Sequence, residues 1–388
     1  MDIKGISNKY KQYVIDMRRE FHMYPEASMH EERTSQRIKE ELAKMGIQSV
    51  SMAGTGVVAD IKGKYEGKTI ALRADIDALE IAEKRDVPHK SLNEGFMHAC
   101  GHDSHAAMLL GAAKIFNEIK DELSGTVRLM FQPGEEIAQG ALRMIEDGAL
   151  NGVDEVFGMH VMANFPTGKM AIGSGPRMAS CDGFKITVKG KGGHGSMPHL
   201  AVDSILAASA IVMNLQSIVS REISPMDIGV VSVDQFNSGT RFNIIADEAV
   251  LIGTTRCYSY DIRQMLPSAM ERIAKSTAAA YRAEAELKYD FMTGPVINND
   301  ISTERARKSI EKIMSKDVVM DMPLQSGAED FSEYLLKVPG TFVIVGVANE
   351  EKDTCYNNHH AKFDIDEDML EHGVALHVQY AVDFLNGE

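Results

Sequence analysis

Side chains that bind divalent metals recur in short segments of this sequence. Cys100 and His102 are two residues apart in MHACGHDSH, and an extended segment would place both side chains on one face. A thiolate and an imidazole are common ligands of zinc and of related transition metals. Taken alone, the segment also fits a buried structural cysteine beside a surface histidine.

Two pairs of carboxylates follow segments rich in β-forming residues. Asp75 and Asp77 end LRADID, and this spacing directs both side chains to the same face of a strand, although a helix cap or a solvated turn is the alternative. Glu135 and Glu136 follow TVRLMFQPG. Because adjacent residues outside a helix tend to point apart, one can bind a metal while the other faces a substrate. Both could instead be acids that favour a helix N-terminus.

Histidines supply the remaining candidates. His160 ends VDEVFGMHV, where a satisfied core histidine is the alternative, and NNHHAKFD contains the adjacent His359 and His360. Together the candidate ligands outnumber those that one tetrahedral ion takes: they are Cys100, His102, Glu136, His160 and one of the two C-terminal histidines. We therefore predict two divalent metal ions, with Glu135 left to move protons.

An alternation of β-rich and helical segments must position these groups. We expect strands at VVADI, TIALRADID, TVRLMFQ and VDEVFGMHV, and helices at 104–119 and 141–145. This alternation is typical of an α/β fold with a mostly parallel sheet covered by helices. Because the carboxyl ends of parallel strands open onto a ligand crevice, the candidate ligands should converge there.

The pattern changes between residues 179 and 291. We expect a strand, a helix, two strands, a helix and a strand, at 184–189, 202–220, 228–236, 249–257, 262–282 and 284–290. This β-α-β-β-α-β order is the ferredoxin-like α+β arrangement. The α/β pattern returns with a helix at 302–314, the strand TFVIVGVA and a helix at 366–385. We predict a discontinuous metal-binding domain over 1–178 and 292–388, interrupted by an inserted domain over 179–291.

Composition disfavours several classes of function. The 388 residues include 41 basic and 56 acidic side chains, a net charge of −15 with no basic block, so we expect no nucleic-acid partner. The longest uncharged apolar stretches have about ten residues, half of what a membrane span needs. The N-terminus is expected to form one amphipathic helix rather than a signal peptide, and the four cysteines form no CxxC pair. We therefore expect a cytoplasmic protein without a membrane segment.

Eight motifs in order over nearly the whole chain resemble the M20 metallopeptidase family. They are LRADIDAL, MHACGHDSHAAMLLGAA, FQPGEE, GMHV, KGKGGHGSMPH, FNIIADEAVLIGTTR, SGAEDF and HHAKFDID. The chain looks most like the amidohydrolase branch, which includes hippurate hydrolases, auxin-conjugate hydrolases and N-acetyldiaminopimelate deacetylases. Two departures, Ala246 and Ala361 where the family often has proline, remove no ligand.

The resemblance implies a role for each candidate in the metal site. Two divalent ions (Zn, Mn, Co or Ni) would be bound, with Glu135 as general base and acid, by Cys100, His102, Glu136, His160 and His359. His359 is preferred to His360 because the family places this ligand five residues before the position of Asp364. Asp77 matches the family's aspartate that orients a ligand, whereas Asp75 has no assigned role.

The inserted domain resembles the family's lid and dimerisation domain. The resemblance implies that His194 stabilises the oxyanion of the reaction, while Asn243 and Arg256 hold the polar end of the substrate. It also implies a homodimer in which His194 of one subunit completes the site of the other.

The expected function is metal-dependent cleavage of the amide bond of an N-acyl amino acid, for example an N-acetyl or benzoyl amino acid. A dipeptidase or aminoacylase of the same family is the nearest alternative, and a dipeptidase would prefer a free α-amino group. A cysteine-nucleophile amidase using Cys100 would tolerate chelators but not thiol alkylation. A non-catalytic protein that binds metal or an amino acid would have no need of Glu135.

Overall fold

The computed structural model describes residues 2–388, which divide into two compact units. The first domain contains residues 2–175, Ile297–Pro323 and Asp330–Glu388. The inserted domain contains Pro176–Val296 together with Leu324–Glu329. The predicted junctions lay at 178/179 and 291/292, and the short segment Leu324–Glu329, predicted in the first domain, belongs with the inserted domain.

The first domain is built on an eight-stranded sheet with the order β1-β2-β4-β3-β5-β16-β6-β15. Its four central strands, β4, β3, β5 and β16, run parallel to one another, while β1, β2 and β6 introduce antiparallel pairs. The bounds are β1 Ser49–Met52, β2 Gly56–Lys62, β3 Tyr65–Asp75, β4 Ser124–Gln132, β5 Glu155–Pro166, β6 Met170–Ile172, β15 Val319–Asp321 and β16 Gly340–Ala348. The predicted α/β class with a mostly parallel sheet is confirmed.

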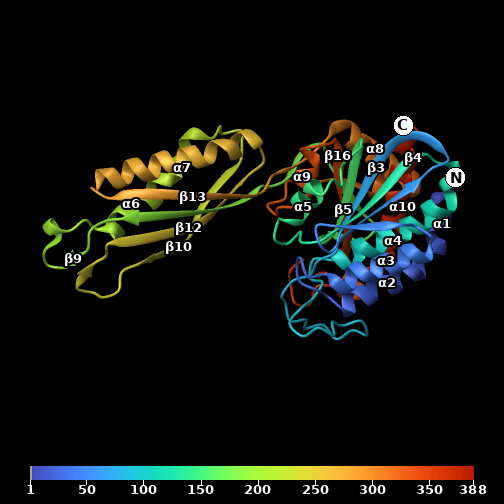
Figure 1. The fold of residues 1–388 in the computed structure, drawn as a ribbon, viewed down its shortest axis with the longest axis horizontal. Coiled ribbons are helices and arrows are strands. Elements are labelled where there is room, and N and C mark those ends of the chain that lie inside the picture. The colour runs from blue at the N-terminus through green and yellow to red at the C-terminus, as the bar shows by residue number, and fades with distance from the viewer. Residues whose placement is uncertain (1) are drawn as a thin grey trace. The chain divides into compact units, whose positions relative to one another are not determined.

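Helices cover this sheet (Figure 1). Their bounds are α1 Ile3–Lys9, α2 Lys11–Met23, α3 Glu32–Lys44, α4 His102–Ile119, α5 Gly140–Glu146, α8 Asp300–Ile313, α9 Phe331–Leu335 and α10 Leu370–Leu385, with short 3₁₀ turns at Lys120–Glu122, Lys316–Val318, Glu350–Lys352 and Glu367–Met369. The N-terminus forms two helices rather than the single one predicted. The chain leaves helical geometry at Tyr10, whose N–H bonds the carbonyl of Ser7 three residues back instead of continuing the α-helical pattern.

Both faces of the central strands are buried, because helices pack on each. Leu72 of β3 belongs to the main apolar core, and α4 and α10 pack against this strand. Its neighbour Arg73 points to the opposite face and lies opposite Gly158 of β5, and Gly158 in turn packs against Phe331 of α9. Asp75, two residues further along β3, shares that face with Arg73 and is fully buried. The sheet therefore carries buried charged groups close to the ends of β3 and β5.

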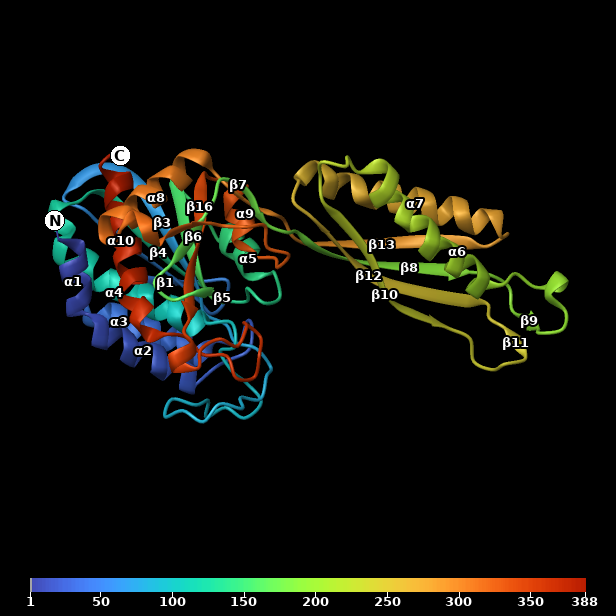
Figure 2. The same ribbon diagram turned by 180° about the vertical axis from the view of Figure 1, so that it is seen from behind.

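The inserted domain has the predicted ferredoxin-like order, with the antiparallel sheet β10-β12-β8-β13. Helices α6 and α7 lie together on one face of this sheet (Figure 2). Its strands are β8 Cys181–Lys189, β9 Gly193–His194, β10 Gly229–Ser238, β11 Ile244–Ile245, β12 Glu248–Cys257 and β13 Glu284–Thr293, while the short strands β7 Gly175–Met178 and β14 Val296–Asn298 lie where the chain passes between the two units. The helices are α6 Ser204–Ser217 and α7 Tyr260–Ala280, with a 3₁₀ turn at Pro198–Leu200 and a π-helical turn at Ile218–Glu222.

The stretch Ser204–Glu222 is long and apolar enough, by length and composition, to cross a membrane. The sequence analysis had not recognised it, because it counted only the uncharged core of this helix. In the fold, Ala207, Ile211 and Leu215 pack into the core of the inserted domain. Leu206 and Met213 on the other side are 55% and 72% exposed. The helix thus forms a layer of the inserted domain with an apolar outer surface.

Candidate metal centre

The five predicted ligands lie together in the first domain, although they come from four separate segments. Two sets of three contribute atoms that all lie within 4.8 Å of one another. The sets are Cys100, His102 and His160 (set A) and Cys100, Glu136 and His359 (set B). The thiol of Cys100 is therefore common to both.

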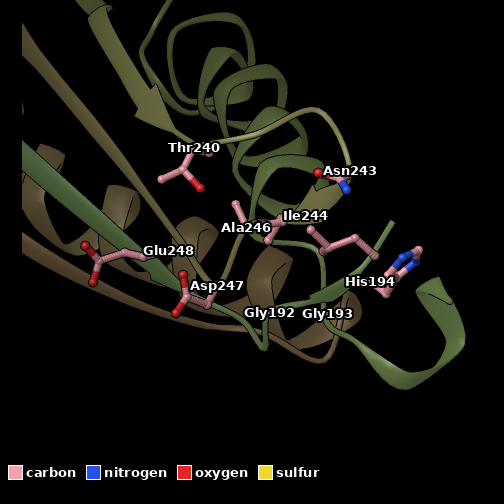
Figure 3. A pocket seen from close by; sticks show the side chains of 11 residues that line it. Gly192, Gly193, His194, Thr240, Asn243, Ile244, Ala246, Asp247 and Glu248 are labelled. Atoms are coloured by element: carbon pink, nitrogen blue, oxygen red, sulfur yellow. The ribbon is translucent and has the colours of Figure 1, made fainter. Parts of the chain in front are cut away.

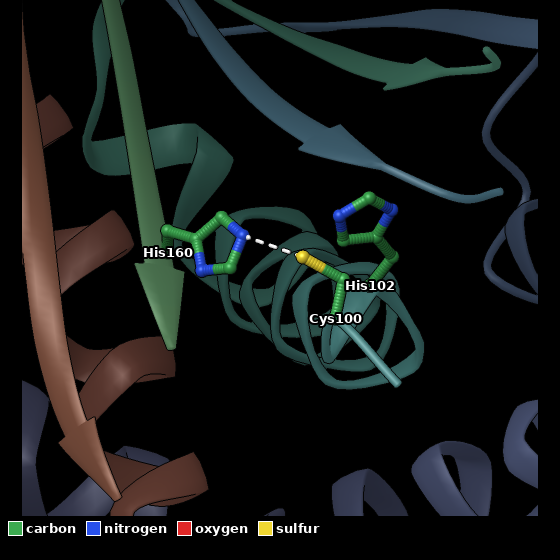
Figure 4. Close-up of side chains that lie close together, drawn as sticks. All are labelled: Cys100, His102 and His160. Carbon is green, nitrogen blue, oxygen red and sulfur yellow. Dashed lines mark hydrogen bonds between the residues drawn. The ribbon is translucent and has the colours of Figure 1, made fainter. Parts of the chain in front are cut away.

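Set A is buried and its ring nitrogens are oriented by hydrogen bonds. The Nδ1–H of His160 donates to the carbonyl of Val161 at 2.7 Å, which directs Nε2 toward Sγ of Cys100 at 3.3 Å (Figure 4). Within the described chain, residues 2–388, Nε2 of His102 has no hydrogen-bond partner although it is buried. A buried nitrogen lone pair of this kind, aimed at a thiol and a second imidazole, suits a metal ion.

Gly101 brings Cys100 and His102 together in a way that the sequence analysis did not foresee. The segment is not extended; Gly101 has a φ of +93°, and His102 begins α4. A Cβ atom at position 101 would lie 2.4 Å from Cγ2 of Val161. Glycine is therefore required both for the left-handed backbone and for the close approach to β5.

Asp77 connects a ligand of set A to a ligand of set B. Its Oδ1 lies 3.1 Å from Nδ1 of His102, and its Oδ2 accepts hydrogen bonds from Oγ of Ser28 at 2.7 Å and from the backbone N–H of Glu136 at 3.0 Å. Burial acts to raise the pKa of Asp77, but the bond and charge of His102 together with the bonds from Ser28 and from the backbone of Glu136 outweigh burial, and the pKa is lowered. The ionised carboxylate thus holds Nδ1–H of His102 and leaves Nε2 for a metal.

The carboxylates of Glu135 and Glu136 lie close together, contrary to the prediction that the two side chains would point apart. One oxygen of each lies within 4.8 Å of the other and of a ring nitrogen of His102. Only Glu136 also belongs to set B, where its Oε1 lies 3.4 Å from Nε2 of His359. The geometry therefore separates the two acids by their neighbours rather than by their direction.

The structure places His359, and not His360, at the cluster. His359 has a φ of +67°, and its N–H donates to the carbonyl of Ala99 at 2.8 Å. His360 instead stacks on Tyr356, with ring centroids 4.8 Å apart.

Asn358 is a positioning group that the sequence analysis missed. Its amide donates to the carbonyls of Cys100 at 3.0 Å and Val161 at 3.1 Å, so it fastens the His359 loop to the segments that carry Cys100 and His160. Its place beside His359 was the only signal in the sequence.

The charges of the cluster fit a cation. Burial, followed by the charge of Glu136, raises the pKa of Cys100. Burial lowers the pKa of His160, whereas the pKa of His102 is raised because Asp75 and Cys100 outweigh burial. A divalent ion would reverse this balance by favouring the thiolate. The donor set of one thiol, three imidazoles and a carboxylate, with an orphaned nitrogen on His102, therefore fits divalent metals.

Asp75 and His105 form a further buried group next to set A. An atom of each lies within 4.8 Å of a ring nitrogen of His102, but Asp75 is already bonded by Arg73 at 2.6 Å and by His105. The sequence analysis gave Asp75 no role and did not single out His105. The three-residue spacing of His105 from His102 on α4, which places them on one helix face, was the available signal.

In the inserted domain, the structure brings together His194 and Asn243 but not Arg256. His194 lies on β9 opposite Ile244 of β11, exposed, with Nδ1 2.8 Å from Oγ of Ser196. His194 and Asn243 line a pocket of about 550 Å³ (Figure 3). Arg256 lies near the far end of β12 from this pocket and donates to the carbonyl of Thr255 at 2.9 Å.

Comparison with known proteins gives a consistent picture. The profile of "Peptidase family M20/M25/M40" matches residues 71–383. Thermostable carboxypeptidase 1 of Saccharolobus solfataricus is 42% identical over 99% of this chain and 98% of its own length. N-acetylcysteine deacetylase of Bacillus subtilis is 42% identical over 92% of this chain and 93% of its own. The crystal structure of the Bacillus subtilis YXEP protein, a dinuclear metal-binding peptidase from the M20 family, has a TM-score of 0.87 at 37% identity, covering 98% of this chain and 99% of that one.

Proposed function

The chain belongs to peptidase family M20/M25/M40, and from this we propose that it is a metal-dependent amidohydrolase that releases amino acids from their N-acyl derivatives. The observation that carries the proposal is the convergence of five ligand-type side chains into sets A and B, with Cys100 in both. The similarity to an N-acetylcysteine deacetylase and to a dinuclear metal-binding peptidase supports it.

Two divalent ions would be held by these sets, one by each. When bound, they would supply an activated water and polarise the carbonyl of the amide. Cys100 would serve both ions as a thiolate, since it is the one group common to the two sets. The mixture of thiolate, imidazole and carboxylate ligands is compatible with Zn, Mn, Co or Ni.

In the proposed reaction, Glu135 transfers the proton of the attacking water. It lies beside His102 and Glu136 and is not a member of set A or set B, so we assign to it the role of accepting a proton from the attacking water. The same group then delivers that proton to the departing amine nitrogen. Asp77 takes no proton and acts by orienting His102.

The inserted domain supplies substrate contacts and a dimer interface in this proposal. His194 would donate to the oxyanion, and Asn243, which lines the same pocket, would hold the carboxylate of the amino acid. Arg256, near the other end of β12, has no part in this contact. The exposed edge strand β10 and the outer surface of α6, with Leu206 and Met213, would pair with a second copy of the chain.

Metal analysis followed by a substrate panel tests the proposal. Gently purified protein should contain two divalent ions per chain and should hydrolyse N-acetyl or benzoyl amino acids. Because one similar protein is a carboxypeptidase, the panel includes N-blocked dipeptides, and free dipeptides cover the dipeptidase alternative. A preference for free dipeptides would contradict the proposed substrate class.

A further inference from the structure

Strand β5 leaves its neighbour β3 before it reaches the metal centre. The two strands are paired only up to Gly158 of β5, opposite Arg73. Val161, three residues further on, remains beside β16 but has no partner on the β3 side. Its N–H instead donates to Nε2 of His105 at 2.9 Å. The side chain of His105 thus replaces a strand at the point where the sheet opens.

The hydrogen bonds determine the tautomer of His105. Because Nε2 accepts from a backbone N–H, the ring proton must be on Nδ1, which donates to Oδ1 of Asp75. The other oxygen of Asp75 accepts from Arg73 at 2.6 Å. All three side chains are buried, so Arg73, Asp75 and His105 form a rigid support for the backbone at Val161.

Among the described residues, this support contacts the rings of two set A ligands, His102 and His160, and is linked to set B only through Asn358, the residue before His359, which also donates to the carbonyl of Val161. Val161 accepts the Nδ1–H of His160, and the rings of His105 and His160 are in edge contact, with centroids 4.6 Å apart. The rings of His105 and His102 stack at 5.5 Å. Within residues 2–388, neither His105 nor Asp75 has a hydrogen bond or ion pair with Glu136 or His359, the ligands specific to set B.

We propose that His105, held by Asp75, is a positioning residue that sets the affinity of only one of the two metal ions, the one bound by Cys100, His102 and His160. The inference rests on the proposed dinuclear centre. Groups that orient metal ligands typically contribute about 10- to 100-fold to metal affinity. Here that contribution should appear at set A and not at set B.

Two substitutions separate the two hydrogen bonds of His105. His105→Gln can place its amide oxygen near the position of Nε2 and keep the bond to Val161, whereas His105→Asn can keep only the bond to Asp75. Metal-free protein is titrated with Zn²⁺ in competition with a chromophoric chelator. We expect His105→Asn to weaken one of the two Zn²⁺ affinities by about 10- to 100-fold and leave the other unchanged, and His105→Gln to lose less.

Double variants identify which ion is affected. His105→Asn combined with Glu136→Ala should retain almost no tight Zn²⁺, because the first change weakens one ion and the second removes a ligand of the other. His105→Asn combined with His160→Ala should bind no less Zn²⁺ than His160→Ala alone. If His105→Asn does not fold, Asp75→Asn takes its place in both combinations, because it removes the charge that holds Nδ1–H of His105.

His377→Leu is the matched control. His377 is also a fully buried histidine, but neither of its ring nitrogens has a hydrogen-bond partner within residues 2–388. The variant should bind two Zn²⁺ with wild-type affinity. Equal weakening of both ions in His105→Asn, unchanged affinity for both, or the same loss in His377→Leu would overturn the inference. Wild-type protein that binds fewer than two Zn²⁺ would instead contradict the dinuclear centre itself.

Discussion

Oδ1 of Asp77 lies 3.1 Å from Nδ1 of His102, so this carboxylate determines which ring nitrogen of the histidine is available to a metal. Asp77→Asn can donate where Asp77 accepts, which permits the wrong tautomer of His102. We expect the affinity for divalent metal to fall by about 10- to 100-fold in a competition titration. Ser28→Ala removes a different bond to Asp77 and should have a smaller effect. Unchanged metal affinity in Asp77→Asn would contradict the orienting role.

Glu135→Gln should retain two metal ions and lose about 10² to 10⁴ in kcat, because it removes only the proton carrier. Metal content and steady-state rates on an N-acetyl amino acid measure the two effects separately. Glu136→Gln is the control and should lose metal. If Glu135→Gln lost metal while Glu136→Gln kept it, the roles of the two acids would be exchanged.

His194→Ala should keep its metals and lose about 10² to 10³ in rate, the typical cost of removing an oxyanion donor. If the proposed dimer shares its sites, mixing this inactive variant with inactive Glu135→Ala under conditions of subunit exchange should restore activity. One of the two sites in a mixed dimer has both groups intact, so at most about a quarter of wild-type activity returns. Proven heterodimers without activity would place His194 in its own subunit's site or outside catalysis.

Arg18 is a buried cation on α2 that joins two segments next to metal ligands. Its Nε donates to Asp103 at 2.9 Å and one Nη to Asp364 at 2.7 Å. Arg18→Met leaves both buried carboxylates without this partner, which should lower the free energy of unfolding by about 3 to 5 kcal/mol in urea titrations. Arg19→Met, which removes only an exposed ion pair with Glu367, should cost at most about 1 kcal/mol. Equal effects of the two substitutions would refute this role of Arg18.

The burial of His377 makes the free energy of unfolding depend on pH. Burial lowers its pKa from an ordinary value of 6.5 to about 3 in the folded protein. Between these two pH values the histidine binds a proton in the unfolded chain but not in the folded chain. The contribution of His377 to the free energy of unfolding is therefore fully present above pH 6.5 and decreases as the pH falls toward 3. From pH 7.5 to 5, His377→Leu should therefore lose about 2 kcal/mol less unfolding free energy than wild type. Parallel losses in urea titrations would show that His377 is not the group involved.

Local patterns predicted the central elements because their periodicity reflects burial. The apolar run of β4 and the strand TFVIVGVA are buried on both faces, as parallel strands require. The short strands β1, β6 and β15 and the helix α3 were not predicted. Three or four residues carry too little periodicity to be distinguished from loops, and α3 combines a strong polar face with few apolar residues.

Motifs predicted the candidate ligands, but not the groups that hold them. Cys100 and His160 can be identified as candidate metal ligands from the chemistry of their side chains, without reference to the fold. The bond from Arg18 to Asp364, by contrast, joins residues 346 positions apart, and the contact of His105 with Val161 depends on where β5 leaves β3. Such partners are determined by tertiary packing, which short-range patterns do not contain.

In the proposed function, hydrolysis depends on metal held at Cys100. Burial raises the pKa of this thiol, the opposite of what an activated cysteine nucleophile needs. The most direct test is to strip the protein with a chelator and follow hydrolysis of an N-acetyl amino acid as Zn²⁺, Mn²⁺, Co²⁺ or Ni²⁺ is added back. We predict that activity disappears on stripping and returns fully only as the second equivalent of metal per chain binds. Full activity in the metal-free protein, abolished only by alkylation of Cys100, would contradict the account.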